Sequence, residues 1–338
     1  MRDHANLPVV DLAELDDLAS LKRGLFETGF FYLRDRPEGF QRLAAIREET
    51  ARFLAEPLGK KQEHAGLLRG YAALGSEDTQ AGFGTGEAGE GDLCEKYTIG
   101  TEPAESERAQ CPAYYEHPEA QRFFAKNWFP NPSFERAWRD YFNHVAFSAS
   151  LVMEAVLKAL GVSQGAWLEQ THRPVSILRF LNYPETASQS VRMAAHYDDN
   201  LLTLLHQSIM TNGMSSLEVM LPGASDWQAV PAHDELFVVN VGEALMYLSE
   251  GRAVATKHRV AAVPPAKRSG SARTSIAYFH APNWDCPLRP VKPREVDSEL
   301  GQMSATFGLE ALQEADGTIS YARLQNRAVD GGLVDQEG

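Results

Sequence analysis

Long hydrophobic runs are absent from the 338-residue sequence. No apolar stretch approaches the roughly 18 residues that a membrane-spanning helix requires. The first residues, Met1 to Asn6, also lack the apolar core of a secretory signal peptide. We therefore expect a protein that has no membrane partner and works in the cytoplasm.

Cysteine is scarce, and its three copies lie far apart, at Cys94, Cys111 and Cys286. An odd number of isolated cysteines fits free thiols in a reducing, cytoplasmic compartment better than a disulfide framework. No two cysteines are close enough in the sequence to form the paired ligands of a typical zinc site.

Positive charge is also in short supply, since 32 Lys and Arg residues face 46 Asp and Glu residues and the net charge is −14. A surface of this sign repels phosphate backbones and anionic lipids, so nucleic acid is not an expected partner. Hydrophobic residues make up 43% of the chain, which is ordinary for a globular protein with a full core. A small-molecule substrate is the expected partner, and composition leaves the oligomeric state open.

Helical patterns fill the first half of the chain. Leucines from Leu12 to Leu25 recur at helical spacing, and a second amphipathic helix is predicted over residues 40–54. A long helix is predicted to begin near Pro132 and to end at Gly161. The Gly-rich, acidic stretch from Gly82 to Gly91 is predicted to be a mobile loop.

After Pro174 the pattern changes to short β-rich runs that are separated by turn residues. These runs are Val175–Leu181, Val191–Ala195, Leu201–Leu205, Leu217–Met220, Leu236–Val241, Ala253–Val260 and Thr274–Phe279. Many short strands with turns between them are typical of a sandwich or jelly roll. We predict one domain, mainly β with flanking helices, in which a mostly helical part (1–173) precedes a jelly-roll core (174–285) and a C-terminal segment (286–338) that is a candidate lid.

A candidate metal site lies in two of these β-rich runs. On a strand, residues two positions apart point to the same face, so His196 and Asp198 can reach one ion. On a helix the two side chains would diverge by about 200°. His258, 60 residues after Asp198, lies in another β-rich run and can supply the third ligand. Two imidazoles and one carboxylate form the facial triad of non-haem iron(II) oxygenases, which leaves coordination positions open.

A candidate carboxylate anchor follows at Arg273 and Ser275, which share one face of the last predicted strand. A guanidinium and a hydroxyl suit a carboxylate, because both can donate hydrogen bonds to it. A metal beside such an anchor is what 2-oxoglutarate requires: its oxoacid end can take two metal positions and leave one for O2. Each motif alone is usually structural, and only their joint order and spacing favour Fe(II), 2-oxoglutarate and O2 as cofactors.

With these residues in hand, the chain resembles the isopenicillin N synthase-like family of iron(II) and 2-oxoglutarate oxygenases. The matching pieces are Pro8 to Leu12, Gly29 to Leu33, Arg69 to Tyr71, Leu236 to Glu243 and the His-x-Asp, His and Arg-x-Ser set. The resemblance implies a distorted double-stranded β-helix, or jelly roll, braced by helices. It also implies a dioxygenase that attacks an unactivated C–H bond, with hydroxylation, desaturation and ring expansion all open.

Within that family the chain is most similar to the cephalosporin expandases, which implies a role in antibiotic biosynthesis and places Met193 beside 2-oxoglutarate. The expandases carry a second arginine where this chain has Leu181, two residues after Arg179. Tyr183, before Pro184, instead resembles the tyrosine that touches 2-oxoglutarate in plant members. Penicillin N is therefore not the expected substrate.

Arg179 and Arg69 are the candidate substrate contacts, and a carboxylate-bearing molecule derived from an amino acid, a peptide or another natural product would suit them. A structural salt bridge is the competing interpretation for both. Two other functions stay open: an oxidase of the isopenicillin N synthase type that uses no 2-oxoglutarate, and a non-catalytic jelly-roll binding protein.

Overall fold

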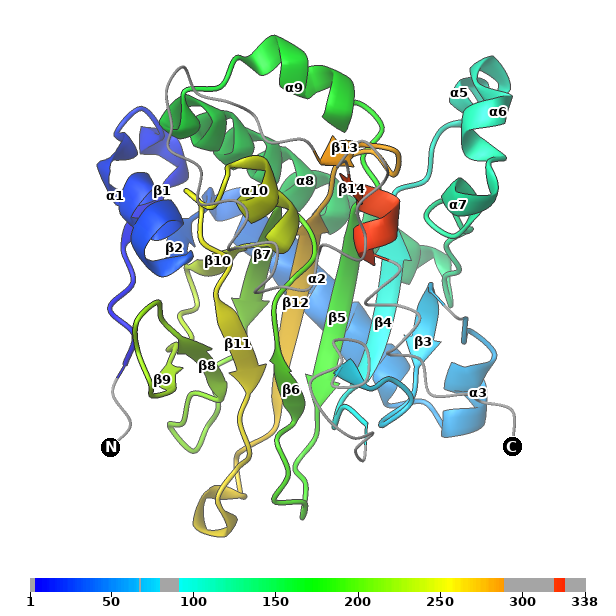
Figure 1. Cartoon of the computed structure of the whole chain (residues 1–338). Helices are drawn as coiled ribbons and strands as arrows, with labels where there is room; N and C mark the ends of the chain where they lie inside the picture. The colour runs from blue at the N-terminus through cyan, green and yellow to red at the C-terminus, as the bar shows by residue number, and fades with distance from the viewer. Residues whose placement is uncertain (1–3, 67, 80–90, 289–318, 326–338) are drawn as a thin grey trace.

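The structure is a computed structural model that describes residues 4–66, 68–79, 91–288 and 319–325 (Figure 1). Within these ranges two β-sheets carry most of the architecture. The main sheet has the strand order β1-β2-β10-β7-β12-β5-β4-β3. Its strands are β1 (Val9–Asp11), β2 (Phe30–Arg34), β3 (Gly70–Ala72), β4 (Glu95–Gly100), β5 (Ile177–Tyr183), β7 (Leu202–Gln207), β10 (Phe237–Val241) and β12 (Arg273–His280).

A smaller sheet lies in front of the main sheet in Figure 1 and has the order β6-β11-β8-β9. Its strands are β6 (Met193–His196), β8 (Leu217–Met220), β9 (Gln228–Ala229) and β11 (Lys257–Val260). A third pair, β13 (Pro287–Leu288) with β14 (Ile319–Ser320), joins the two described parts of the C-terminal region. Two facing, mostly antiparallel sheets confirm the predicted jelly-roll core.

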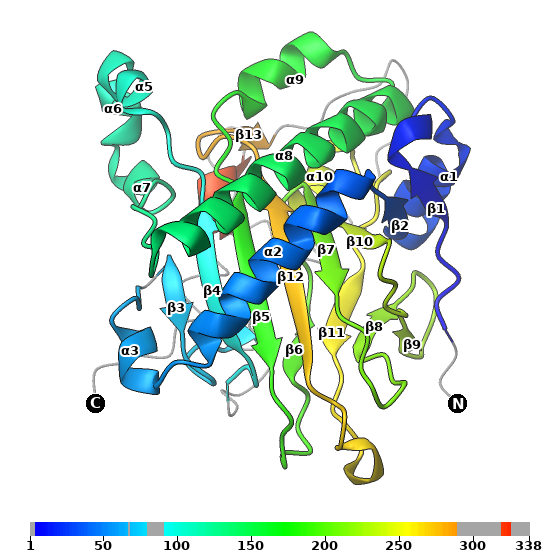
Figure 2. The same cartoon turned by 180° about the vertical axis from the view of Figure 1, so that it is seen from behind.

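Two long helices cover the outer face of the main sheet (Figure 2): α2 (Pro37–Leu54) and α8 (Pro132–Leu160). Asn131 caps α8, because its side chain accepts a hydrogen bond from the Phe134 backbone N–H at 2.9 Å, and Pro132 fits the first helical position. Gly161 ends the helix in the left-handed conformation with φ 71°. Both boundaries of this predicted helix are confirmed.

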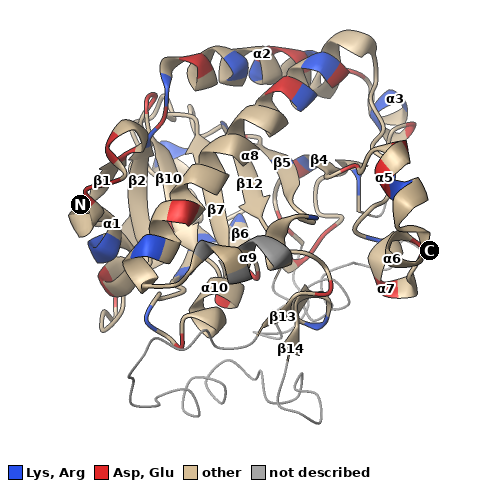
Figure 3. Cartoon of the chain, turned by 90° about the horizontal axis from the view of Figure 1, so that it is seen from above, with Lys and Arg blue, Asp and Glu red and all other residues tan. Residues whose placement is uncertain are grey.

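The remaining helices are short and lie around the sheets. They are η1 (Leu12–Glu14), α1 (Leu18–Arg23), η2 (Gly24–Thr28), α3 (Leu58–Gln62), α5 (Glu105–Gln110), α6 (Pro112–Tyr115), α7 (Pro118–Gln121), α9 (Gln164–Thr171), α10 (Glu243–Leu248) and η3 (Pro265–Lys267). Figure 3 shows acidic and basic positions side by side along α2, on the solvent side of the helical layer.

The two faces of β12 point into different environments. Ile276 and Tyr278 join the large core beneath the helices. Ala277 instead joins a small buried cluster with Tyr183 of β5 and Val260 of β11, so this cluster spans both sheets. Residues that alternate with the helix-facing set therefore line an interior between the sheets, and the candidate site lies there.

Two sequence predictions fall largely outside the described residues: the Gly-rich loop, apart from Gly91, and most of the C-terminal segment. No helix in the described ranges combines the length and hydrophobicity that a membrane crossing needs.

Candidate active site

His196, Asp198 and His258 meet at one end of the small sheet. His196 is the last residue of β6, and it lies opposite His258 of the antiparallel neighbour β11. Asp198 follows two residues after the end of β6. One ligand atom from each side chain lies within 4.8 Å of the other two. The Asp198 Oδ1 is 3.7 Å from His196 Nε2 and 3.6 Å from His258 Nε2.

Backbone carbonyls fix how the two imidazoles face the site. His196 Nδ1 lies 2.8 Å from the Ala194 carbonyl, and His258 Nδ1 lies 3.1 Å from the Thr256 carbonyl. A carbonyl can only accept, so each Nδ1 carries the proton and donates it. Each Nε2 then presents a lone pair towards the Asp198 carboxylate, which is the arrangement a metal ion needs.

The two oxygens of Asp198 have different surroundings. Its Oδ2 accepts hydrogen bonds from Asn240 Nδ2 at 2.7 Å and from Thr203 Oγ1 at 2.5 Å. Both donors come from the main sheet, Asn240 from β10 and Thr203 from β7. Its Oδ1 is therefore the oxygen left facing the histidines. These two donors were not found by the sequence analysis.

Electrostatics hold His196 and Asp198 in their ligand forms. Burial, followed by the neighbouring His258, lowers the pKa of His196 to about 4. Burial alone would raise the pKa of Asp198, but the two histidines and the Asn240 and Thr203 hydrogen bonds outweigh it, so this pKa is lowered. At neutral pH His196 is thus uncharged and Asp198 ionised. Two imidazole nitrogens and one carboxylate oxygen fit a non-haem iron(II) ion.

The predicted carboxylate anchor lies on the inward face of β12. Arg273 and Ser275 are buried, at 4% and 2% exposure. Arg273 Nη1 donates to Ser216 Oγ at 3.0 Å, and its guanidinium lies 5.0 Å from the ring centre of Tyr183. The Tyr183 hydroxyl is 3.9 Å from Met193 Sδ. The structure thus brings the four residues predicted to surround 2-oxoglutarate into one interior.

Arg179 and Arg69 are engaged within the protein. Arg179 donates to Thr98 Oγ1 at 3.1 Å and forms an ion pair with Glu77 at 3.2 Å. Arg69 is 6% exposed and donates to the backbone carbonyls of Leu68 and Phe123 at 2.8 and 2.7 Å. Arg179 therefore forms a salt bridge, as expected if its role is structural. Arg69 binds backbone carbonyls and forms no salt bridge within the described ranges.

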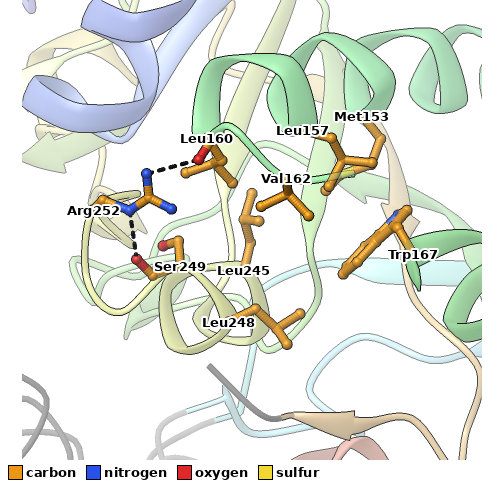
Figure 4. A pocket seen from close by; sticks show the side chains of 9 residues that line it. All are labelled: Met153, Leu157, Leu160, Val162, Trp167, Leu245, Leu248, Ser249 and Arg252. Carbon is orange, nitrogen blue, oxygen red and sulfur yellow. Dashed lines mark hydrogen bonds between the residues drawn. The ribbon is translucent and has the colours of Figure 1, made fainter. Parts of the chain in front are cut away.

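A small apolar crevice lies elsewhere, between α8, the start of α9 and α10 (Figure 4). It encloses about 10 Å³, room for about one water molecule. Arg252 borders it and donates to the carbonyls of Leu160 at 2.9 Å and Ser249 at 3.3 Å. None of its lining residues belongs to the interior between the sheets, so it is part of the helical support.

Tyr321, from the C-terminal part of the chain, lies near Asp198 and Asp199 of the candidate active site. It is fully buried, and its backbone N–H donates to the Cys286 carbonyl at 3.0 Å. Burial raises its pKa, and the negative charges of Asp199 and Asp198 raise it further. Residue spacing gave no signal for this approach, because more than 120 positions separate Tyr321 from Asp198 in the sequence.

Comparisons with known proteins agree with this geometry. Residues 174–282 match the family model of the 2OG-Fe(II) oxygenase superfamily, and residues 7–125 match that of the non-haem dioxygenase in morphine synthesis N-terminal region. Deacetoxycephalosporin C synthase of Amycolatopsis lactamdurans is 30% identical over 90% of this chain and 93% of its own length. Homoarginine-6-hydroxylase of Glycine max is 25% identical over 86% of this chain and 89% of its own.

Solved structures show the same fold. A 2OG-Fe(II) oxygenase family protein from Caulobacter crescentus superposes with a TM-score of 0.69 at 22% identity, covering 90% of this chain and 99% of that one. A Neurospora crassa protein solved with alpha-KG and 5-formyluracil gives a TM-score of 0.71 at 22% identity over 95% of both chains. This chain belongs to the 2OG-Fe(II) oxygenase superfamily, whose members are dioxygenases that use Fe(II), 2-oxoglutarate and O2.

Proposed function

We propose that His196, Asp198 and His258 hold the iron(II), and that Arg273 and Ser275 hold the far carboxylate of 2-oxoglutarate. The observation that carries this proposal is the cluster of three ligand atoms within 4.8 Å, next to a buried arginine-serine pair in the same interior. One domain, working in the cytoplasm, would contain the whole site.

When bound, the iron with 2-oxoglutarate and O2 supplies oxidation of a C–H bond, coupled to conversion of 2-oxoglutarate to succinate and CO2. The protein residues position the groups and exclude water. Tyr183 and Met193 lie beside the anchor and contact each other through the Tyr183 hydroxyl and the Met193 sulfur. The small buried cluster around Ala277 lies in the interior between the sheets.

The proposed substrate is a small, carboxylate-bearing molecule derived from an amino acid, a peptide or another natural product. Arg179 supports this class, because it lies on the inward face of β5, in line with Leu181 and Tyr183. The Arg179 side chain is still 24% exposed beside its partner Glu77. By their names, one of the relatives described above makes deacetoxycephalosporin C and the other hydroxylates homoarginine.

The deciding experiment is an anaerobic titration of the iron(II)-loaded protein with 2-oxoglutarate, followed by the weak visible charge-transfer band of a chelated oxoacid. We expect the band in the wild type, no band in His196→Ala, and weaker 2-oxoglutarate binding in Arg273→Ala. Iron binding without a band would favour the oxidase that uses no 2-oxoglutarate, and absence of iron binding would refute the metal site.

The role of Arg179 has its own test. Arg179→Ala should weaken binding of a carboxylate-bearing substrate while the affinity for 2-oxoglutarate stays unchanged. Unchanged substrate affinity would leave Arg179 with its ion pair to Glu77 as a purely structural contact.

A further inference from the structure

Arg192, directly before β6, is a buried cation that the site described above does not use. It is 0% exposed. Its Nη1 donates to the Ser271 carbonyl at 2.9 Å and its Nη2 to the Pro184 carbonyl at 2.6 Å. Its Nε is buried and has no hydrogen-bond partner among the residues that the structure describes.

The two carbonyls belong to the chain on either side of the co-substrate anchor. Pro184 directly follows Tyr183 at the end of β5, and Ser271 lies two residues before Arg273 at the start of β12. Tyr183 and Arg273 are paired partners in these strands. The guanidinium of Arg192 therefore ties together the ends of the two strands that carry the anchor.

The ring of Tyr183 also lies close to two cations. The guanidinium carbon of Arg192 is 5.1 Å from the ring centre of Tyr183, and that of Arg273 is 5.0 Å from it. Within the described ranges neither guanidinium forms an ion pair with a carboxylate. Burial, followed by the repulsion from Arg273, lowers the pKa of Arg192 to about 10.

An uncompensated pair of buried like charges is costly for the free protein, and a ligand that brings negative charge relieves that cost. Backbone carbonyls compensate Arg192 only in part, because they carry dipoles and no net charge. A carboxylate ligand would supply the negative charge that compensates the two guanidinium groups. Arg273 and Ser275 already face the interior where such a carboxylate would bind.

We propose that the charge of Arg192 selects for a dicarboxylate co-substrate, by attracting the far carboxylate that Arg273 and Ser275 bind directly. Arg192 is a positioning residue, since its guanidinium donates to the backbone carbonyls of Ser271 and Pro184 and acts on the co-substrate through its charge. This inference rests on the proposed use of Arg273 and Ser275 as the carboxylate anchor.

The test compares two oxoacids of equal chain length, 2-oxoglutarate and 2-oxopentanoate, which lacks the far carboxylate. Dissociation constants are measured anaerobically on the iron(II)-loaded protein through the charge-transfer band. In Arg192→Gln we expect the preference for 2-oxoglutarate to fall on the order of tenfold, as for two charges several ångströms apart at an effective dielectric constant near 20. Binding of 2-oxopentanoate should change little.

Arg192→Lys keeps the charge, so its preference for 2-oxoglutarate should stay close to that of the wild type. If Arg192→Gln does not fold, Arg192→Lys still tests the proposal. Loss of the preference for 2-oxoglutarate over 2-oxopentanoate in the lysine variant would overturn it. Arg252→Gln is the matched control, since Arg252 also clasps two backbone carbonyls but lies at the apolar crevice. It should leave the preference unchanged.

Equal weakening of both oxoacids in Arg192→Gln would show that Arg192 is only a structural clasp, and unchanged binding of both would show no role at all. Either result overturns the proposal. A wild type that binds both oxoacids equally would instead refute the anchor assigned to Arg273 and Ser275, so the two failures can be told apart.

Discussion

Asp198 is held more firmly than its place in the chain suggests. It lies in a loop, two residues beyond β6, yet its Oδ2 is fixed by donors from two strands of the opposite sheet. A carboxylate fixed through one oxygen can offer only the other to a metal. The geometry therefore favours binding through Oδ1 alone, which preserves open positions for other ligands.

Replacing Asn240 by Leu, or Thr203 by Val, should free the Asp198 carboxylate and weaken metal binding about 10- to 100-fold, the usual effect of removing a group that orients a ligand. Titration with Mn²⁺, followed by electron paramagnetic resonance of the free ion, measures this directly. Thr211→Val, at an exposed position, is the control. Unchanged Mn²⁺ affinity in both site variants would mean that these donors do not orient Asp198.

The sequence predicted the three candidate ligands but not the residues that hold Asp198 in place. His196, Asp198 and His258 were predicted because short-range strand alternation and local motif order carry that information. Thr203 and Asn240 were not, because their contact with Asp198 depends on how two sheets face each other. Spacing along the chain does not encode that distance.

The same limit applies to secondary-structure elements. Both ends of α8 follow from local chemistry, an Asn cap and a glycine stop, and both were predicted. No strand was predicted over β4, whose inward side chains include Lys96 and Thr98. Polar and apolar residues do alternate from Lys96 to Ile99, but over only four positions, which is the shortest run that indicates a strand. In the structure Lys96 is paired with Asp92 at 2.8 Å and with Glu77 at 2.6 Å, which makes the burial tolerable.

The end of α8 gives a stability test. Gly161 has φ +71° with open space around its Cα, so Gly161→Ala should cost about 1–2 kcal/mol of unfolding free energy from backbone strain alone. Gly165, in α9, also has open space but no positive φ. Gly165→Ala should therefore be neutral or stabilise by up to about 1 kcal/mol. Urea denaturation of both variants checks the contrast, and equal effects would contradict it.

His206 makes the contact between β7 and α2 sensitive to acid. Arg47 of α2 donates to its Nδ1 at 3.0 Å, and its Nε2 donates to the Asp234 carbonyl at 3.0 Å. Burial, followed by the Arg47 charge, lowers the pKa of His206 from 6.5 to about 4. Between these two pH values the unfolded chain binds the proton and the folded chain does not, so stability falls as the pH drops from 6.5 towards 4.

His206→Gln should reduce that pH dependence by up to about 1.4 kcal/mol per pH unit. The measurement is the free energy of unfolding by urea at several pH values between 4 and 7. His4→Gln, at an exposed position, is the control and should leave the slope unchanged. The proposed linkage would be wrong if the slope of the His206 variant equalled that of the wild type.

At the scale of the whole molecule, the candidate site connects the two sheets. The small sheet supplies His196 and His258, while the main sheet supplies the donors to Asp198 and the Arg273 anchor. Ligands that bind only this assembled arrangement must stabilise the fold as a whole.

Mn²⁺ and 2-oxoglutarate, each at about 100 times its dissociation constant, should each add about 2.7 kcal/mol to the free energy of unfolding. Calorimetry without and with the ligands measures the resulting rise in Tm. Asp198→Ala should show little of the metal-dependent rise. A wild-type Tm that did not respond to either ligand would mean that the sheets are not coupled through this site.

The two faces of β12 place different requirements on its residues. Its residues Arg273 and Ser275 face the interior between the sheets, and the alternate residues Ile276 and Tyr278 face the helices. A lineage can therefore exchange the helix-facing residues in concert with α8, as long as the packed volume is kept, without altering the catalytic face.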